Sequence, residues 1–162
     1  MQGVLVVGNP KPGSRTREAG ERLLAAFRPD ATTVIELAEL GPGLLGWGDA
    51  AVQAAVATVQ AADVAVFASP TFKASYTGLL KLFLDQFAGG TGLQGVLGVP
   101  LMLSAAAEHA LVAEYTLRPV LDELGATPAP PLHLIDATFQ EDGRIEAWAE
   151  RWIPLLRPRL GA

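Results

Sequence analysis

Residues 3–16 read GVLVVGNPKPGSRT, an apolar segment followed by a loop that contains glycine and proline. The unbroken apolar run over 3–8 is typical of a strand that is buried on both faces of a sheet. From about residue 14 to residue 27 the apolar side chains recur at helical spacing, which predicts a helix directly after the loop. The stretch is therefore predicted to be a strand, a loop and a helix whose N-terminus faces that loop.

The same alternation of strand and helix continues along the chain. Asp49 is a suitable N-cap for one of the later helices, and Pro119 predicts a kink in the longest one. Alternation of this kind indicates parallel strands joined by right-handed crossovers, with helices on both faces of the sheet. Further strands are predicted at about 32–37, 62–68, 99–104 and 132–136, and further helices at about 49–60, 78–87, 108–124 and 144–156.

The length of 162 residues suits a single domain, which we expect to cover residues 1–162. The expected fold is α/β, a three-layer sandwich around a five-stranded parallel sheet with strand order 2-1-3-4-5. In that topology a ligand binds beyond the carboxyl ends of the first and third strands. The loops after the first, third and fourth strands are therefore the expected site.

The composition excludes several classes of site and partner. The chain has no cysteine, which rules out disulfides, thiolate zinc sites and cysteine nucleophiles, and its two histidines argue against a histidine-rich metal centre. A formal charge of −5 without a long basic run argues against nucleic acid as a partner. The sequence has no basic leader and no run of about 20 apolar residues, so we expect a soluble cytoplasmic protein.

The loop after the first strand has the residue types that a phosphate group requires at a helix N-terminus. Ser14 and Thr16 supply hydroxyl donors. Lys11 and Arg15 supply positive charge, and an arginine can bind a phosphate through two hydrogen bonds. The loop matches neither the Walker A pattern nor GxGxxG. The alternative is that Ser14 or Thr16 only caps the helix and that both cations are solvated.

The loop after the third strand, residues 69–77, reads SPTFKASYT. We expect an extended segment that turns backbone N–H and C=O groups and an aromatic wall toward a planar ring. The alternative for Phe72 and Tyr76 is ordinary packing at a subunit contact. The candidate ring-binding residues are Pro70, Thr71, Phe72, Lys73, Ser75 and Tyr76.

These two loops resemble those of the NADPH-dependent FMN reductases, and most closely the branch that serves alkanesulfonate assimilation. The family's first loop, Gly-Ser-x-Arg-x-x-Ser-x-(Ser/Thr/Asn), is similar to residues 8–16, with Asn9 in place of serine and Lys11 in place of arginine. Its second motif, (Thr/Ser)-Pro-x-Tyr-x-x-Ser-x-x-Gly-x-Leu-Lys-x-x-x-Asp, is similar to residues 69–85, with Phe72 in place of tyrosine.

The resemblance also bears on the segment after the fourth strand. Ser104 and Ala105 stand where the family usually has two glycines that let backbone amides approach the flavin, and both are still small. His109 matches a histidine of the branch, with a local role at a helix N-terminus as the alternative. Tyr115 can accompany a π-bulge or pack in a dimer core. His133, in the last strand, is expected to be a hydrogen-bonded core or edge histidine.

The resemblance implies a flavodoxin-like, FMN-binding fold and an NAD(P)H-dependent FMN reductase that transfers a hydride from NADPH or NADH to FMN. It implies FMN contacts from Asn9, Ser104, Ala105 and His109 beside the residues named above, with no catalytic acid or base and no metal ligand. It also implies a homodimer or homotetramer, and a flavin-dependent monooxygenase as a partner. The alternatives are a quinone or azo reductase with tightly bound FMN, a flavodoxin-like electron-transfer module without NAD(P)H turnover, and a relative that has lost flavin binding.

Overall fold

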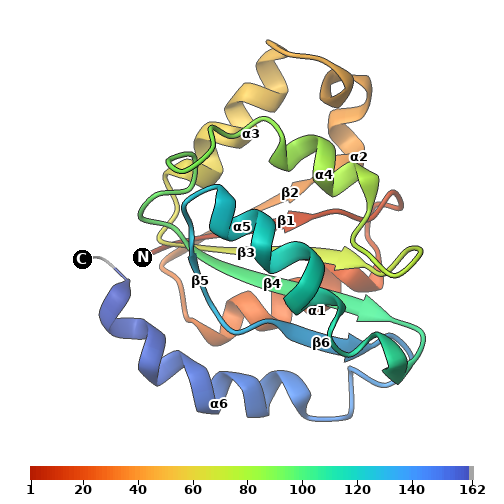
Figure 1. Cartoon of the computed structure of the whole chain (residues 1–162). Helices are drawn as coiled ribbons and strands as arrows, with labels where there is room; N and C mark the ends of the chain where they lie inside the picture. The colour runs from red at the N-terminus through yellow and green to blue at the C-terminus, as the bar shows by residue number, and fades with distance from the viewer. Residues whose placement is uncertain (161–162) are drawn as a thin grey trace.

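A computed structural model describes residues 1–160 of the chain, apart from the side chain of Arg159. Six strands form one sheet with the order β2-β1-β3-β4-β5, and β6 also pairs with β4 (Figure 1). All the pairings are parallel, which confirms the predicted fold class and strand order. The strands are β1 (Gln2–Val7), β2 (Ala31–Glu36), β3 (Val64–Pro70), β4 (Leu97–Ser104), β5 (Thr127–Pro128) and β6 (Leu132–Ile135).

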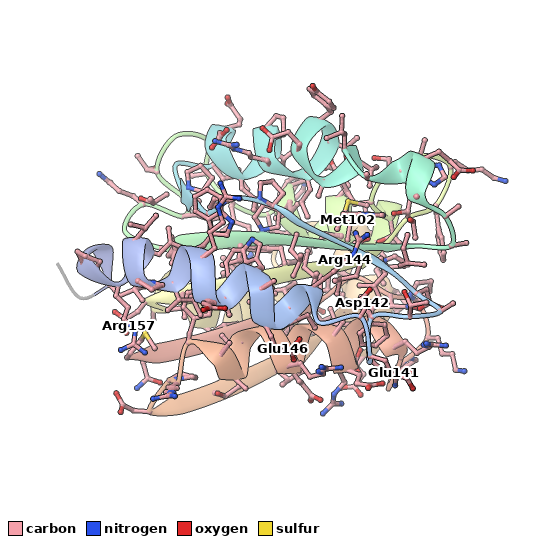
Figure 2. The ribbon with its side chains drawn as sticks, turned by 90° about the horizontal axis from the view of Figure 1, so that it is seen from below. Met102, Glu141, Asp142, Arg144, Glu146 and Arg157 are labelled. Carbon is pink, nitrogen blue, oxygen red and sulfur yellow. The ribbon has the colours of Figure 1, made fainter. Side chains whose placement is uncertain are left out.

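Helices cover both faces of the sheet. Figure 1 shows α1 and α6 on one face and α3, α4 and α5 on the other, and Figure 2, seen from below, has α6 in front of the sheet. The α-helices are α1 (Arg15–Ala26), α2 (Leu37–Leu40), α3 (Ala50–Gln60), α4 (Gly78–Leu84), α5 (Arg118–Glu123) and α6 (Arg144–Leu156). The 3-10 helices are η1 (Gly41–Leu45), η2 (Ala107–His109) and η4 (Arg157–Arg159), and η3 (Ala113–Leu117) is a π-helix.

The core consists of two apolar layers that share the sheet. Successive side chains of a strand point to opposite faces, so Val4 and Val6 of β1 pack with α3, α4 and α5, whereas Leu5 and Val7 pack with α1 and α6. All four of these side chains are buried. This explains why the strands are continuous apolar runs in the sequence.

The fifth position of the sheet differs from the sequence prediction. One strand was expected at 132–136, but two short strands, β5 and β6, pair with β4 one after the other along its length and are separated by residues 129–131. The N–H of Ala129 still donates to the carbonyl of Gly98 at 2.8 Å. Pro130 and Pro131 have no N–H to continue the ladder, so the strand is interrupted at that point.

The segment expected to be one kinked helix over 108–124 is also divided. It consists of η2, the π-helix η3 and then α5. Pro119 is the second residue of α5 and has no N–H to donate to the preceding π-helical turn. The proline therefore marks the change from π-helix to α-helix, and Tyr115 lies inside the π-helical turn, one of the two arrangements expected for it.

Other helix ends agree more closely with the sequence. The carboxylate of Asp49 accepts hydrogen bonds from the N–H groups of Ala51 and Val52, which confirms the predicted cap of α3. The last helix has the predicted limits, whereas α4 ends at Leu84, three residues before the predicted end. Within residues 1–160, none of the helices has both the length and the apolar character that crossing a bilayer requires.

Candidate functional site

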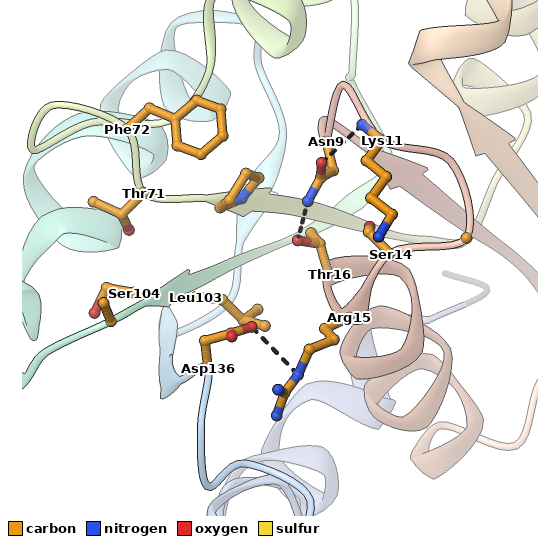
Figure 3. A pocket seen from close by; sticks show the side chains of 13 residues that line it. Asn9, Lys11, Ser14, Arg15, Thr16, Thr71, Phe72, Leu103, Ser104 and Asp136 are labelled. Carbon is orange, nitrogen blue, oxygen red and sulfur yellow. Dashed lines mark hydrogen bonds and ion pairs between the residues drawn. The ribbon is translucent and has the colours of Figure 1, made fainter.

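A pocket of about 430 Å³ opens at the carboxyl edge of the sheet (Figure 3). Its walls come from the loops after β1, β3, β4 and β6. In a parallel sheet these loops meet at one edge, which is where the predicted topology places a ligand.

The start of α1 forms one wall of this pocket. Ser14 is the N-cap of the helix, and its hydroxyl accepts the N–H of Arg17 at 3.4 Å. The hydroxyl of Thr16 accepts from the amide Nδ2 of Asn9 at 3.0 Å, while the Asn9 Oδ1 accepts the N–H of Lys11 at 2.9 Å. The first N–H groups of a helix have no intrahelical acceptor. The wall therefore combines free backbone donors with two hydroxyls held in place.

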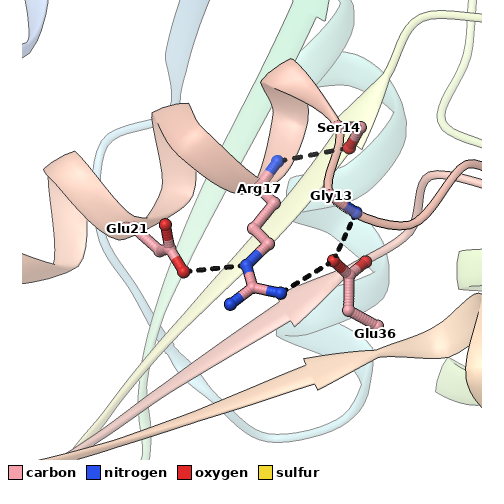
Figure 4. A network of polar contacts seen from close by, with 5 residues as sticks. All are labelled: Gly13, Ser14, Arg17, Glu21 and Glu36. Atoms are coloured by element: carbon pink, nitrogen blue, oxygen red, sulfur yellow. Dashed lines mark hydrogen bonds and ion pairs between the residues drawn. The ribbon is translucent and has the colours of Figure 1, made fainter.

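A buried carboxylate anchors the far half of the same loop (Figure 4). Glu36, at the end of β2, is only 5% exposed. Its Oε1 accepts the N–H of Gly13 at 2.9 Å and the Nη1 of Arg17 at 3.3 Å, and Arg17 also donates to Glu21 at 2.8 Å. The other Glu36 oxygen has no hydrogen-bond partner among the described residues. The loop after β1 is thus tied to the neighbouring strand, an arrangement that the sequence analysis missed.

The loops after β1 and β3 are held together at Gly8. A Cβ at this position would lie 2.8 Å from the Cβ of Leu80, so only glycine fits against α4 here. The Thr77 hydroxyl donates to the carbonyl of Gly8 at 2.6 Å and accepts the N–H of Leu80 at 3.1 Å. Thr77 is therefore at once the N-cap of α4 and a bridge between the two loops that form the pocket.

The loop after β3 is a tight hairpin, and the prediction of an extended segment is wrong for it. Phe72 and Ser75 exchange backbone hydrogen bonds at 2.9 and 3.2 Å, and the N–H of Thr71 donates to the carbonyl of Leu103 at 2.7 Å. The two residues between them, Lys73 and Ala74, have φ of 52° and 61°. Because the N–H groups of Thr71, Phe72 and Ser75 are paired within the protein, they are not available to a ligand in the pocket.

Ser104 joins the end of β4 to a buried histidine. Its Oγ donates to the carbonyl of Ala106 at 2.7 Å and lies 2.6 Å from the Nε2 of His133. Because the single hydroxyl proton serves the carbonyl, Nε2 of the imidazole is the donor to Oγ. His133 Nδ1 is buried without a partner among the described residues, so the expected fully bonded histidine is only half bonded. Burial, together with the charges of Arg144 and His109, lowers the pKa of His133.

Three charged side chains line the pocket. Lys11 and Arg15 are the predicted cations, and Asp136, at the end of β6, was not predicted. Arg15 Nε lies 3.6 Å from Asp136 Oδ1, as Figure 3 shows. The guanidinium also lies over the ring of Phe139, 5.5 Å from its centroid. The positive charge of the site is thus partly balanced by a carboxylate within it.

The pocket brings most of the predicted site residues together. Four of them do not line it: Lys73 and Ser75 belong to the hairpin, Tyr76 packs against the core beside α4, and His109 lies in η2. Burial raises the pKa of Tyr76. The predicted residues that line the pocket are Asn9, Lys11, Ser14, Arg15, Thr16, Pro70, Thr71, Phe72, Ser104 and Ala105.

Three residues of the lining, Gly13, Leu103 and Asp136, were not among the candidate site residues. Gly13 lies within the loop after β1, and Leu103 precedes Ser104 on β4. Asp136 directly follows the last strand, so the rule that carboxyl ends of parallel strands meet at one edge was sufficient to find it.

Comparisons with known proteins converge on one family. A model of the NADPH-dependent FMN reductases matches residues 1–141. The chain is 30% identical over 176 residues to a Pseudomonas aeruginosa protein described as an FMN reductase (NADPH), a match that covers 96% of this chain and 92% of the relative. It is 33% identical over 104 residues to the FMN reductase (NADPH) of Escherichia coli K12, covering 63% of this chain and 51% of the relative. This second match thus spans about half of the relative's length.

A solved structure supports the same grouping. The chain superposes on an NADH:FMN oxidoreductase, EMOB, in its apo form, with a TM-score of 0.87 and 30% sequence identity. The superposition covers 99% of this chain and 90% of the other. The named relatives therefore include proteins described with NADPH and one described with NADH.

Proposed function

Because the chain belongs to the NADPH-dependent FMN reductase family, we propose that it binds FMN in the pocket of Figure 3 and oxidises NAD(P)H there. Family membership makes the protein an oxidoreductase that uses FMN and a reduced nicotinamide nucleotide. The observation that supports this pocket as the site is its asymmetry. One wall has a helix N-terminus, hydroxyls and cations, whereas the opposite wall has an exposed aromatic ring.

The first wall fits a phosphate. The hydroxyls of Ser14 and Thr16 and the N–H groups that begin α1 are donors, and Lys11 and Arg15 add positive charge. Ser14 is both the helix cap and a lining residue, so capping does not exclude phosphate binding. We assign these residues to the FMN phosphate.

The opposite wall fits the flavin ring. Phe72 lines the pocket and is 51% exposed, so its ring is available to pack against a planar ligand. The Thr71 hydroxyl is buried without a hydrogen-bond partner among the described residues, and rotation of the side chain toward the pocket would let it bond a polar edge of the ring. Ser104 and Ala105, at the end of β4, are small enough to let a ligand approach the backbone.

When bound, FMN supplies the redox chemistry by taking a hydride from the reduced nicotinamide. No side chain of the pocket has to act as an acid or base for that transfer, and we assign none. The residues of this chain bind the phosphate, orient the ring and leave one ring face open to the nicotinamide. We further propose that reduced FMN leaves for a flavin-dependent monooxygenase.

We also propose that the protein is a homodimer or homotetramer. Large apolar side chains are strongly exposed on the side of the sheet covered by α3, α4 and α5, which favours a protein contact there. These side chains are Leu45, Trp47, Leu111 and Tyr115, with exposures of 76%, 76%, 59% and 73%.

Titration of the purified protein with FMN, followed by flavin fluorescence, tests the proposed site. We expect Arg15→Ala to weaken FMN binding roughly tenfold, because a charged hydrogen bond to phosphate is lost. Arg22→Ala is the matched control, since Arg22 lies on the same helix but pairs with Glu146 of α6. Equal effects of the two substitutions would contradict the assignment of Arg15.

Addition of NADPH or NADH to the same sample then tests the activity. Loss of the visible flavin absorbance is expected for a reductase. Binding of FMN without that loss would instead support an electron-transfer module. Absence of FMN binding would overturn the proposed site and would point to Phe72, Ser104 and Ala105, three of the departures from the family motifs.

A further inference from the structure

Asp136 lies in the pocket beside the arginine that we assign to the FMN phosphate. The Asp136 N–H donates to the carbonyl of Ser104 at 2.8 Å, which fixes the start of the loop after β6 against the end of β4. The two side chains of the Arg15–Asp136 pair are each 46% exposed. The pair therefore faces solvent and the pocket at once, and a ligand can reach it.

The two side chains of this pair differ in how far they can move. Asp136 has a short side chain on an anchored backbone, whereas Arg15 has a long side chain at the first position of α1. The guanidinium contacts both the carboxylate and the ring of Phe139. The Arg15 edge that contains Nε cannot hold the carboxylate and a phosphate together, so a phosphate that binds this edge displaces Asp136.

We propose that Asp136 competes with the FMN phosphate for Arg15 and thereby weakens FMN binding, so that the flavin can dissociate. The inference rests on the proposed function, since it concerns FMN in the same pocket. Asp136 is then a positioning residue that acts through Arg15. A carboxylate of like charge near a phosphate also repels it directly, and the experiment has to separate that effect from competition.

Substitution Asp136→Asn tests the inference, because it removes the charge and keeps the shape of the side chain. We expect FMN to bind about twofold to fivefold more tightly, the range for breaking one exposed ion pair. Riboflavin, which has no phosphate, should bind as it does to the unchanged protein. Asp122→Asn is the matched control, because Asp122 undergoes the same charge change beside Arg118 on α5.

A double-mutant cycle with Arg15→Ala separates competition from direct repulsion. If Asp136 acts through Arg15, Asp136→Asn should change FMN binding little when Arg15 is already alanine. An equal gain in both backgrounds would show direct repulsion and overturn the inference. Thermal unfolding midpoints of all four proteins check that the substitutions do not act by unfolding the site.

The outcomes distinguish this inference from the function on which it rests. If the unchanged protein does not bind FMN, the proposed function and the inference both fail. If it binds FMN but Asp136→Asn binds it equally or more weakly, only the inference fails. If Asp136→Asn tightens FMN and riboflavin alike, the carboxylate does not act on the phosphate, and the inference fails as well.

Discussion

At the scale of single residues, the pocket depends on hydroxyls that each serve two partners. The hydroxyl of Ser104 bonds the Ala106 carbonyl and His133, and the hydroxyl of Thr77 bonds the Gly8 carbonyl and the N–H of Leu80. Each joins a loop of the pocket to a neighbouring segment. Removing one partner of a buried hydrogen bond leaves the other unsatisfied and costs about 1–3 kcal/mol.

The burial of His133 predicts a pH dependence of stability. The pKa of His133 is lowered from its usual value of 6.5 by burial, so the unfolded chain binds the proton more readily than the folded one. The free energy of unfolding should therefore fall as the pH drops below about 6.5, by at most about 1.4 kcal/mol per pH unit. Urea unfolding at about pH 7.5 and about pH 5.5, on either side of the usual histidine pKa, measures this change in the free energy of unfolding.

The substitution His133→Gln should reduce this dependence, because glutamine does not titrate and can still donate to Ser104. His109→Gln is the control for the second histidine. If the pH dependence of the free energy of unfolding were unchanged in His133→Gln but reduced in His109→Gln, it would come from His109, which would contradict the prediction.

At the scale of elements, the sequence motif of the loop after β3 was identified correctly, but its backbone conformation was not predicted. The residues of the segment matched the expected ring wall, and Phe72 does line the pocket. The hairpin, however, requires two consecutive residues with positive φ, a conformation that favours asparagine and glycine. Lys73 and Ala74 lack that preference, so no local signal marked the turn.

The hairpin predicts a stabilising substitution. Ala74→Gly should raise the free energy of unfolding by about 1 kcal/mol, because it relieves a positive φ that disfavours a side chain. Ala57→Gly, at an exposed position inside α3, should lower that free energy by about 0.5–1 kcal/mol. Chemical denaturation of the two variants beside the unchanged protein measures both. A loss of stability in Ala74→Gly would show that the turn is not strained.

At the scale of the whole molecule, the two core layers depend on one sheet. On one face, the ring centroid of Phe27, the C-cap of α1, lies 6.0 Å from that of Trp148 in α6, and Arg22 pairs with Glu146. On the other face, the rings of Phe83 and Phe87 pack edge to face, 5.3 Å apart. Neither layer of helices has a core without the strands between them.

This dependence predicts one cooperative unfolding transition for the single domain expected over 1–162. Far-UV circular dichroism and tryptophan fluorescence should give the same midpoint. Fluorescence reports mainly on the α6 side of the sheet, where Trp148 is buried, whereas circular dichroism reports on the helices of both sides. FMN should raise the midpoint in proportion to the logarithm of its concentration, since it binds only the folded state. Separate midpoints for the two probes would contradict a single domain.

The sequence by itself determined the parallel α/β fold and the family, because these depend on local signals. The strand order followed from the topology that is common for such an alternation of strands and helices. Apolar runs and helical periodicity predict the elements, and the loop after β1 has its phosphate-binding residue types within a few positions. The edge rule for parallel strands then located the pocket between the loops after β1, β3 and β4.

Only the tertiary structure decided which side chains hold the pocket in shape. Glu36 reaches Gly13 from a neighbouring strand, Thr77 reaches Gly8, and Asp136 reaches Arg15 from the far end of the sheet. Each of these contacts joins residues that are far apart in the sequence. The periodicity of apolar residues gives information only about residues within one helix or strand. These contacts join different elements, and they form only when packing of the two core layers sets the distances between those elements.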